Sequence, residues 1–226
     1  MTTEQFLRRM DAAIEQHAML SHPFYQSWNA GALSADTLRE YAKQYYAHVR
    51  AFPTYVSAVH SRCDDIATRQ MLLENLIEEE HGENNHPELW LRFAEGLGVD
   101  RNDVRTAELL PHTSASVNRL KAVTQRADAM EGIAALYAYE SQIPAVALTK
   151  REGLKAFYDV SDERAVSFFR VHEHADVIHR TVEREILATV TDEAQQERII
   201  AAAEESAKAL WHFLDGVHMA YNGGVC

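Results

Sequence analysis

Residues 171–179 read VHEHADVIH, and the apolar residues around this stretch recur with helical spacing. His172, Asp176 and His179 stand at positions i, i+4 and i+7, so on one continuous helix they would fall within about 60° of one another. Imidazole and carboxylate groups in this pattern suit Fe, Mn or Zn. Apolar residues beside them indicate a partly buried face, where unpaired polar groups are costly. The stretch therefore predicts part of a metal site in a helical protein.

Helical spacing extends over almost the whole chain. Glycine and proline are scarce, with 9 and 5 residues, and no stretch alternates as a strand would. No linker or shift in composition divides the chain. We therefore expect one all-α domain over residues 1–226, a bundle of seven to eight helices. Its long helices are predicted over residues 35–62, 66–85, 128–153 and 161–189.

The charge balance and the cysteine content exclude several classes of protein. The chain has 22 Lys and Arg residues against 34 Asp and Glu, a net charge of −12, and lacks the basic stripe of a nucleic-acid-binding protein. No run of about 18 apolar residues predicts a membrane span, and the N-terminus has no signal-peptide pattern. The cysteines, Cys63 and Cys226, form no CxxC motif, which fits a reducing cytoplasm and excludes a thiolate zinc site. We expect a cytoplasmic protein with no nucleic-acid or membrane partner.

Two further segments carry acids and histidines in a helical setting. Residues 75–90 read NLIEEEHGENNHPELW, and on one continuous helix Glu79 and His86 would share a stripe with Glu83. Glu140 is an isolated acid in the apolar and aromatic stretch LYAYESQIPAV, and buried carboxylates are rare without a partner. Acids and histidines at these spacings also occur on solvated helix faces, so this reading stays open for the first segment.

The candidate ligands from the three segments form one set. Three carboxylates and three imidazoles suit two transition-metal ions held between facing helices. Ferritin-like di-iron proteins use a related arrangement with Glu-x2-His spacing. Because Glu78/His81 and Glu83/His86 fit that spacing, a ferritin-like site stays open as an alternative. The candidate ligands are Glu79, His86, Glu140, His172, Asp176 and His179.

The order and spacing of these residues resemble the CADD family (chlamydial protein associating with death domains), which belongs to the heme-oxygenase-like di-metal oxidases. Thiaminase II and pyrroloquinoline-quinone synthase C are structural cousins of that family. The resemblance implies a heme-oxygenase-like fold, a homodimer, and the candidate residues as ligands of two transition-metal ions, Fe and/or Mn. It also implies O2 as a co-substrate and an external reductant. The motifs that carry it are SHPFY (21–25), EEEHGENNHPELW (78–90), YAYESQIPAVALTK (137–150) and HEHADVIH (172–179).

The same resemblance implies an activity, the formation of 4-aminobenzoate for folate from the protein's own side chains. The matching residues are Tyr25 and Tyr41 as sources of the ring and Lys150 as the source of nitrogen. Tyrosine already has the para-substituted six-carbon ring of the product, and cleaving its unactivated C–C bond calls for a metal–oxygen oxidant. Tyr139, beside Glu140, is a candidate radical relay or hydrogen-bond donor to a carboxylate ligand.

Two features of this assignment depend on the tertiary structure. Lys150 follows Glu140 by ten residues, which is about 15 Å along an ideal helix, so contact with the metals would need a break at Pro144, a flexible reach or a relay. Phe168 stands four residues before His172, at a position where related chains can carry a tyrosine. If that hydroxyl takes part in the reaction, another group must replace it here.

Three other functions stay open from the sequence. The same metal site could oxidise a separate small molecule, such as an amino acid, a fatty acid or a pyrroloquinoline-quinone-type precursor. A metal-free relative resembling thiaminase II would need a cysteine nucleophile, for which Cys63 and Cys226 are the candidates. A non-enzymatic interaction protein, as the family name suggests, would need a partner-binding surface that no motif indicates.

Overall fold

The computed structural model describes residues 1–173 and 175–221, and in this part of the chain every regular element is helical. The predicted all-α class is confirmed. A short 3-10 turn, η1 (Met19–Ser21), lies between the first two helices. The helices are α1 (Thr3–Glu15), α2 (Pro23–Asn29), α3 (Ala35–His60), α4 (Ile66–Glu80), α5 (His86–Gly96), α6 (Arg101–Arg105), α7 (Pro111–Thr124), α8 (Ala129–Glu140), α9 (Ile143–Phe157), α10 (Glu163–His172), α11 (Ala175–Leu187) and α12 (Glu193–Tyr221).

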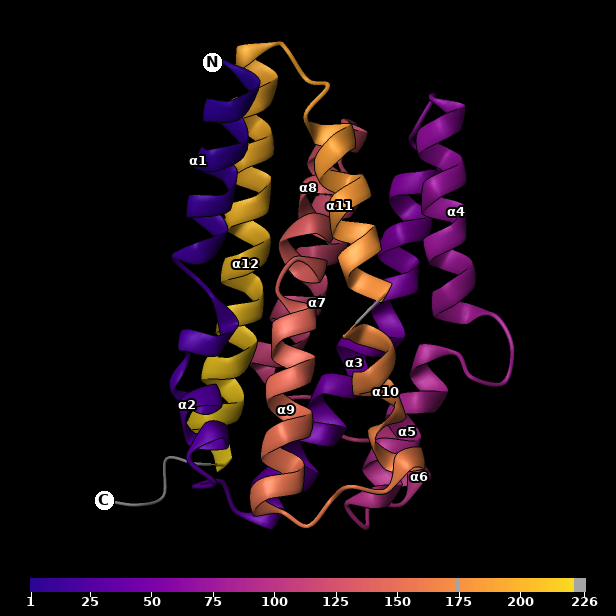
Figure 1. Cartoon of the computed structure of the whole chain (residues 1–226), viewed down its shortest axis with the longest axis vertical. Coiled ribbons are helices and arrows are strands. Elements are labelled where there is room, and N and C mark those ends of the chain that lie inside the picture. The colour runs from indigo at the N-terminus through magenta and orange to yellow at the C-terminus, as the bar shows by residue number, and fades with distance from the viewer. Residues whose placement is uncertain (174, 222–226) are drawn as a thin grey trace.

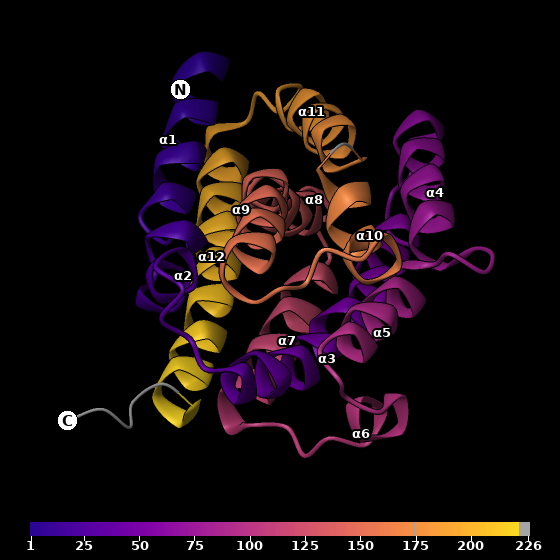
Figure 2. The same ribbon diagram turned by 60° about the horizontal axis from the view of Figure 1, so that its bottom comes forward.

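The longest helix, α12, runs along one side of the bundle beside α1 and also packs against α7 and α8 (Figure 1). Helix α3 packs against α4, α5 and α7, and α10 packs against α5 and α9. Figure 2 shows α8 and α9 between α12 on one side and α10 and α11 on the other, with α4 at the edge opposite α1. None of the described helices is long and apolar enough to cross a membrane.

Helix α3 carries an inward stripe of aromatic residues. The Ser34 hydroxyl caps its first turn, as serine commonly does at this position. Tyr41, Tyr45, His48 and Phe52 recur every three or four residues and are all buried, so they share one face of the helix. This face lines the centre of the bundle and positions several of the residues discussed below.

Two of the predicted long helices are divided in the structure, and a third ends early. The segment 128–153 forms α8 and α9, because Pro144 lacks an N–H and is tolerated in a first turn but not within a helix. The segment 66–85 ends early, and Asn85 caps the separate helix α5. The segment 161–189 forms α10 and α11. The described residues therefore contain more α-helices than the seven to eight expected, although the helical bundle itself is confirmed.

Candidate metal centre

Two groups of buried carboxylates and histidines lie where α4, α5, α8, α10 and α11 meet. In each group the candidate ligand atoms all lie within 4.8 Å of one another, which is close enough to share one ion. The structure thus brings together the six residues predicted as ligands, while their role as ligands stays a prediction. The first ligand group is Glu79, His86 and His172, and the second ligand group is Glu140, Asp176 and His179.

The first ligand group is assembled from three separate helices. Glu79 lies in the last turn of α4, His86 is the first residue of α5, and His172 is the last residue of α10. The prediction that Glu79 and His86 share a stripe of one helix is wrong, because α4 ends at Glu80 and a turn leads into α5. Glu83, assigned to the same stripe, lies in that turn with its side chain exposed. A turn, rather than helical spacing, brings the two ligands together.

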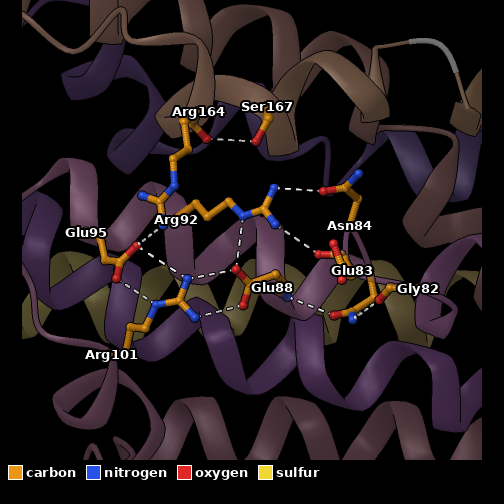
Figure 3. Close-up of polar contacts among 10 residues, drawn as sticks. Gly82, Glu83, Asn84, Glu88, Arg92, Glu95, Arg101, Arg164 and Ser167 are labelled. Atoms are coloured by element: carbon orange, nitrogen blue, oxygen red, sulfur yellow. Dashed lines mark hydrogen bonds and ion pairs between the residues drawn. The ribbon is translucent and has the colours of Figure 1, made fainter.

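An arginine network holds this turn from the outside (Figure 3). Arg92 on α5 donates to Asn84 Oδ1 at 2.8 Å and to the carbonyl oxygen of Glu83 at 2.9 Å. It also donates to the Glu88 carboxylate at 3.0 Å. Arg101 ties the same Glu88 carboxylate to α6 through hydrogen bonds of 2.7 and 2.8 Å. These bonds fix the first residues of α5 relative to the end of α4.

The second ligand group lies between α8 and α11. Glu140 is the last residue of α8, and Asp176 and His179 lie near the start of α11. On one helix His172 would share their stripe, but α10 ends at His172 and α11 is a separate helix. That part of the prediction is wrong. His172 instead joins the first ligand group, where its ring centre lies 4.3 Å from that of His86.

Both ligand groups contain buried polar atoms without a hydrogen-bond partner, as expected of atoms that bind a cation. His86 Nδ1, Glu140 Oε2 and Asp176 Oδ2 are buried and have no hydrogen-bond partner among the described residues. Such atoms cost about 1–3 kcal/mol each when left unsatisfied. His86 Nδ1 lies 2.8 Å from Oε2 of Glu79 without forming a directed hydrogen bond, as expected of two ligands that point to a shared ion. The donor set suits divalent transition metals.

Two of the histidines are held through one ring nitrogen. His172 Nδ1 lies 2.7 Å from the carbonyl oxygen of Phe168, so a proton on Nδ1 leaves Nε2 as the ligand atom. His179 Nδ1 faces Glu140 at 3.1 Å, and its Nε2 lies 3.2 Å from Oε2 of Glu78. A carboxylate on the outer nitrogen of a metal-binding histidine fixes the orientation of the ring. Glu78 therefore supports the second ligand group.

Burial and mutual repulsion shift the pKa values of the ligands. Burial lowers the pKa of His86 and of His172 to about 4, so both rings are neutral at neutral pH and free to bind a cation. Burial, and then the charge of Glu140, raise the pKa of Glu79 well above its usual value. Burial also raises the pKa of Asp176 to about 6. A bound divalent cation would stabilise carboxylates that are this costly to ionise together.

Lys150 is fully buried in a cage of aromatic rings near His172. Burial lowers the pKa of its amine well below the ordinary value of 10.5. Among the described residues, rings rather than carboxylates surround its Nζ, and a charge there would lower the pKa of His172. The rings and their distances from Nζ are Tyr45 (4.4 Å), Tyr41 (5.0 Å), Trp90 (5.4 Å), Tyr25 (5.5 Å) and Phe169 (5.7 Å).

The break between α8 and α9 decides where Lys150 lies. On a continuous helix it would stand about 15 Å from Glu140. Helix α9 instead packs against α2 and α10, and Trp28 Nε1 donates to the carbonyl oxygen of Lys150 at 3.3 Å. As a result, Tyr25 from α2, Tyr41 from α3 and Lys150 from α9 meet in one cluster.

Four tyrosine hydroxyls form two pairs in this region. The hydroxyls of Tyr25 and Tyr41 lie 3.2 Å apart, and the Tyr139 hydroxyl donates to that of Tyr45 at 2.8 Å. The alternative in which Tyr139 donates to a carboxylate ligand is therefore wrong. Tyr45 is not among the residues predicted from the sequence. The sequence feature that could have indicated it is its position one helical turn after Tyr41, on the same inner face of α3.

A cavity of about 20 Å³ lies between the ligand groups and the tyrosines. Tyr45 and Tyr139 line it together with all three residues of the first ligand group and the two carboxylates of the second. Phe168 also lines it and stacks on His172, with ring centres 4.0 Å apart. Phe168 brings no hydroxyl, but two tyrosines border the same cavity.

Comparison with known proteins identifies the family. Residues 39–211 match the model of the iron-containing redox enzymes. The 4-aminobenzoate synthase of Nitrosomonas europaea is 41% identical over 98% of this chain and 94% of its own. The chain belongs to this family. Within it, the sequence groups with the 4-aminobenzoate synthases, as the resemblance to the CADD family implied, and that of Chlamydia trachomatis serovar D is 38% identical over 93% of this chain and 90% of its own.

Solved structures confirm the heme-oxygenase-like fold of this iron-containing redox enzyme. A TenA homologue from Pseudomonas syringae superimposes with a TM-score of 0.81 at 18% identity, over 95% of this chain and 91% of its own. A CADD-like protein of unknown function from Nostoc punctiforme gives 0.74 at 17% identity, over 99% and 98%. A Shewanella denitrificans domain with a heme-oxygenase-like fold gives 0.80 at 17% identity, over 98% and 94%.

Two of the alternatives from the sequence lose support. A ferritin-like site would use His81 and Glu83, whose side chains are exposed. A thiaminase-like reaction would use a cysteine thiolate, but Cys63 is buried and burial raises the pKa of its thiol, which disfavours the thiolate. Cys226 lies outside the described residues.

Proposed function

We propose that this enzyme forms 4-aminobenzoate for folate biosynthesis from the ring of its own Tyr25 or Tyr41 and the nitrogen of Lys150. Two transition-metal ions, Fe and/or Mn, would occupy the two ligand groups, with O2 as co-substrate and an external reductant. The observation that carries this proposal is the enclosure of the Lys150 amine by tyrosine rings beside the buried ligands. A buried lysine without a carboxylate partner is costly, and use of its amine explains that cost. Identity to 4-aminobenzoate synthases supports the same reaction.

The space in the site favours side chains over a separate substrate. The cavity measures about 20 Å³, and a single water molecule needs roughly 10–15 Å³ on this scale. A molecule of the size of O2 fits, whereas a fatty acid, an amino acid or a quinone precursor does not. Tyr25 and Tyr41, both fully buried, already occupy the volume next to the Lys150 amine.

The residues of the cage prepare the reacting groups. When bound, the ions would supply activation of O2, because carboxylate and imidazole ligands can leave coordination positions open. Burial lowers the pKa of Lys150, so the amine keeps its lone pair and can act as a nucleophile. The hydroxyl pair of Tyr25 and Tyr41 holds the two phenols together beside it. The surrounding rings exclude water from this reaction.

The pair formed by Tyr45 and Tyr139 joins the cavity to the cage. Burial raises the pKa of both hydroxyls, so both stay protonated. The 2.8 Å bond from Tyr139 to Tyr45 allows the hydrogen atom of the Tyr139 hydroxyl to pass to the Tyr45 oxygen once Tyr45 has lost its own hydrogen atom, so that the Tyr45 phenol is restored and Tyr139 is oxidised in its place. The ring centre of Tyr45 lies 5.5 Å from that of Tyr41. We assign this pair the role of a relay between the ligand side and the cage.

Exposure of reduced, metal-loaded protein to O2 without added substrate tests the proposal. We expect 4-aminobenzoate, a mass loss at Tyr25 or Tyr41, and nitrogen-15 in the product when the protein carries labelled lysine. Lys150→Met should abolish the product, whereas Lys155→Met, an exposed lysine on the same helix, should not. Product that forms only after addition of a small molecule, with both tyrosines intact, would overturn the proposal and favour an oxidase of a separate substrate.

We further propose that the enzyme acts as a homodimer and has no nucleic-acid partner. The dimer is proposed from the resemblance to the CADD family. The net charge of −12 argues against a nucleic-acid partner. Light scattering tests the dimer, and a mass near 25.6 kDa, that of one chain, would contradict it.

A further inference from the structure

Glu183 is a buried carboxylate on α11 that belongs to neither ligand group. It is 4% exposed. It lies one turn beyond His179 and two turns beyond Asp176, so the three residues share the inner stripe of α11. Its carboxyl group abuts that of Glu140. Glu183 therefore lies at the edge of the second ligand group.

No N–H or hydroxyl donor among the described residues bonds to the oxygens of Glu183, and the polar contact that its carboxyl group makes is with the carboxyl group of Glu140. Its neighbours use their donors elsewhere. The Asn75 amide nitrogen donates to Glu140 Oε1 at 3.0 Å, while the two ring nitrogens of His179 face Glu140 and Glu78. Asn75 Oδ1 and Glu140 Oε2 are also unpartnered. Glu183, Asn75 and His179 line the gap between α4 and α11, so acceptor oxygens gather there without matching donors.

A cation explains this gathering of oxygens. Two buried carboxylates in contact repel each other, and each is costly to ionise away from water. A divalent metal ion bound by both removes the repulsion and satisfies the oxygens. Glu185, on the same helix, is exposed and needs no such partner. Burial, contact with Glu140 and the lack of donors distinguish Glu183 from an ordinary helix acid.

We propose that Glu183 is a fourth ligand of the second ligand group. This site would then offer three carboxylates and one imidazole to a divalent transition-metal ion, whereas the first ligand group offers one carboxylate and two imidazoles. The inference deepens the proposed function and rests on its placement of a metal at the second ligand group. The second ligand group already has one carboxylate more than the first, and Glu183 would widen that difference.

Titration of the metal-free protein with Mn(II) alone tests the inference, with calorimetry and the electron paramagnetic resonance signal of free Mn(II) as readouts. We expect two bound equivalents in the wild type and in Glu185→Gln. In Glu183→Gln, binding of one equivalent should weaken at least about tenfold. The metal-free Glu183→Gln protein should melt at or above the wild-type Tm, because the amide of Gln is neutral and can donate to the unpartnered oxygens beside it. This stability readout separates a missing ligand from a damaged fold.

Two results would overturn the inference. Wild-type affinity for both equivalents in Glu183→Gln would overturn it and leave the proposed function standing. Failure of the wild type to bind Mn(II) would overturn it together with the metal placement in the proposed function. If Glu183→Gln does not fold, Glu183→Asp is used instead. The aspartate side chain is one methylene shorter, so its carboxylate lies farther from the metal. Wild-type affinity for both equivalents in Glu183→Asp would overturn the inference.

Discussion

The Lys150 amine lies 4.4 Å from the centre of the Tyr45 ring, and Tyr45 also lines the cavity between the ligand groups. One tyrosine thus contacts both parts of the site, the metal ligands and the cluster of reactive side chains. The contact arises because Tyr45 lies on the inner face of α3, toward which α9 brings Lys150. Each side of this contact, and the groups that support it, can therefore be changed separately by substitution.

Replacement of Lys150 by Met is expected to stabilise the protein. Burial lowers the pKa of Lys150 in the folded state, so over the range between that pKa and 10.5 the unfolded chain binds more protons. Wild-type stability therefore rises with pH in this range and falls as the pH drops, a dependence that Lys150→Met lacks. Tm measured between about pH 7 and pH 10 checks this. Equal pH slopes in the two proteins, or a less stable variant at neutral pH, would contradict it.

Replacement of Tyr45 by Phe is expected to lower 4-aminobenzoate yield at least about tenfold without changing the number of bound metal ions. The change removes the acceptor of the Tyr139 hydroxyl and keeps the ring beside Lys150. Tyr55→Phe is the matched control, because its buried hydroxyl donates only to a backbone carbonyl, that of Val117 at 3.2 Å. An undiminished yield in Tyr45→Phe would remove the relay role.

Replacement of Glu78 by Ala is expected to weaken the binding of one metal ion by about 10–100-fold. Glu78 Oε2 lies 3.2 Å from Nε2 of His179, and without it the imidazole loses the carboxylate that faces this nitrogen. Calorimetric titration with Mn(II) gives the affinity. Glu80→Ala, an exposed acid two residues away, should bind as the wild type does. Equal affinities in both variants would show that Glu78 does not position the ligand.

Replacement of Gly153 by Ala is expected to lower the Tm and the product yield together. A Cβ at this position would lie 2.7 Å from ring atoms of Trp28, and such overpacking costs about 1–3 kcal/mol. The displaced indole would lose its bond to the Lys150 carbonyl oxygen and shift the cage. Glu152→Ala, at an exposed neighbouring position, serves as the control. A variant with wild-type Tm would show that the indole moves aside freely.

The helices and the ligand types could be predicted because both depend on local pattern. The helical period of apolar residues marked the helical segments, and Glu140 stood out as an acid in an apolar stretch that is buried in the structure. Helix ends were less predictable. The break after Glu140 had a sequence signal, Pro144, which also set the position of Lys150.

Residues that act through contacts with distant segments were harder to find. Glu78 and Glu183 look like ordinary helix acids in the sequence, and only their positions beside His179 and Glu140 distinguish them. Tyr45 is likewise one of several tyrosines on α3. The role proposed for Tyr45 depends on its contact with Lys150, which is 105 residues away in the sequence. The packing of α9 brings Lys150 to the Tyr45 ring.

The sequence by itself determined that the chain is helical and that His172, Asp176 and His179 belong to one polar cluster, because residue spacing and the cost of burying polar groups are local properties. Only the tertiary structure decided that His172 serves the first ligand group while Asp176 and His179 serve the second. That division depends on where α10 ends and on which helices face α11. Such breaks follow from the packing of segments far apart in the chain, and spacing along one helix carries no information about them.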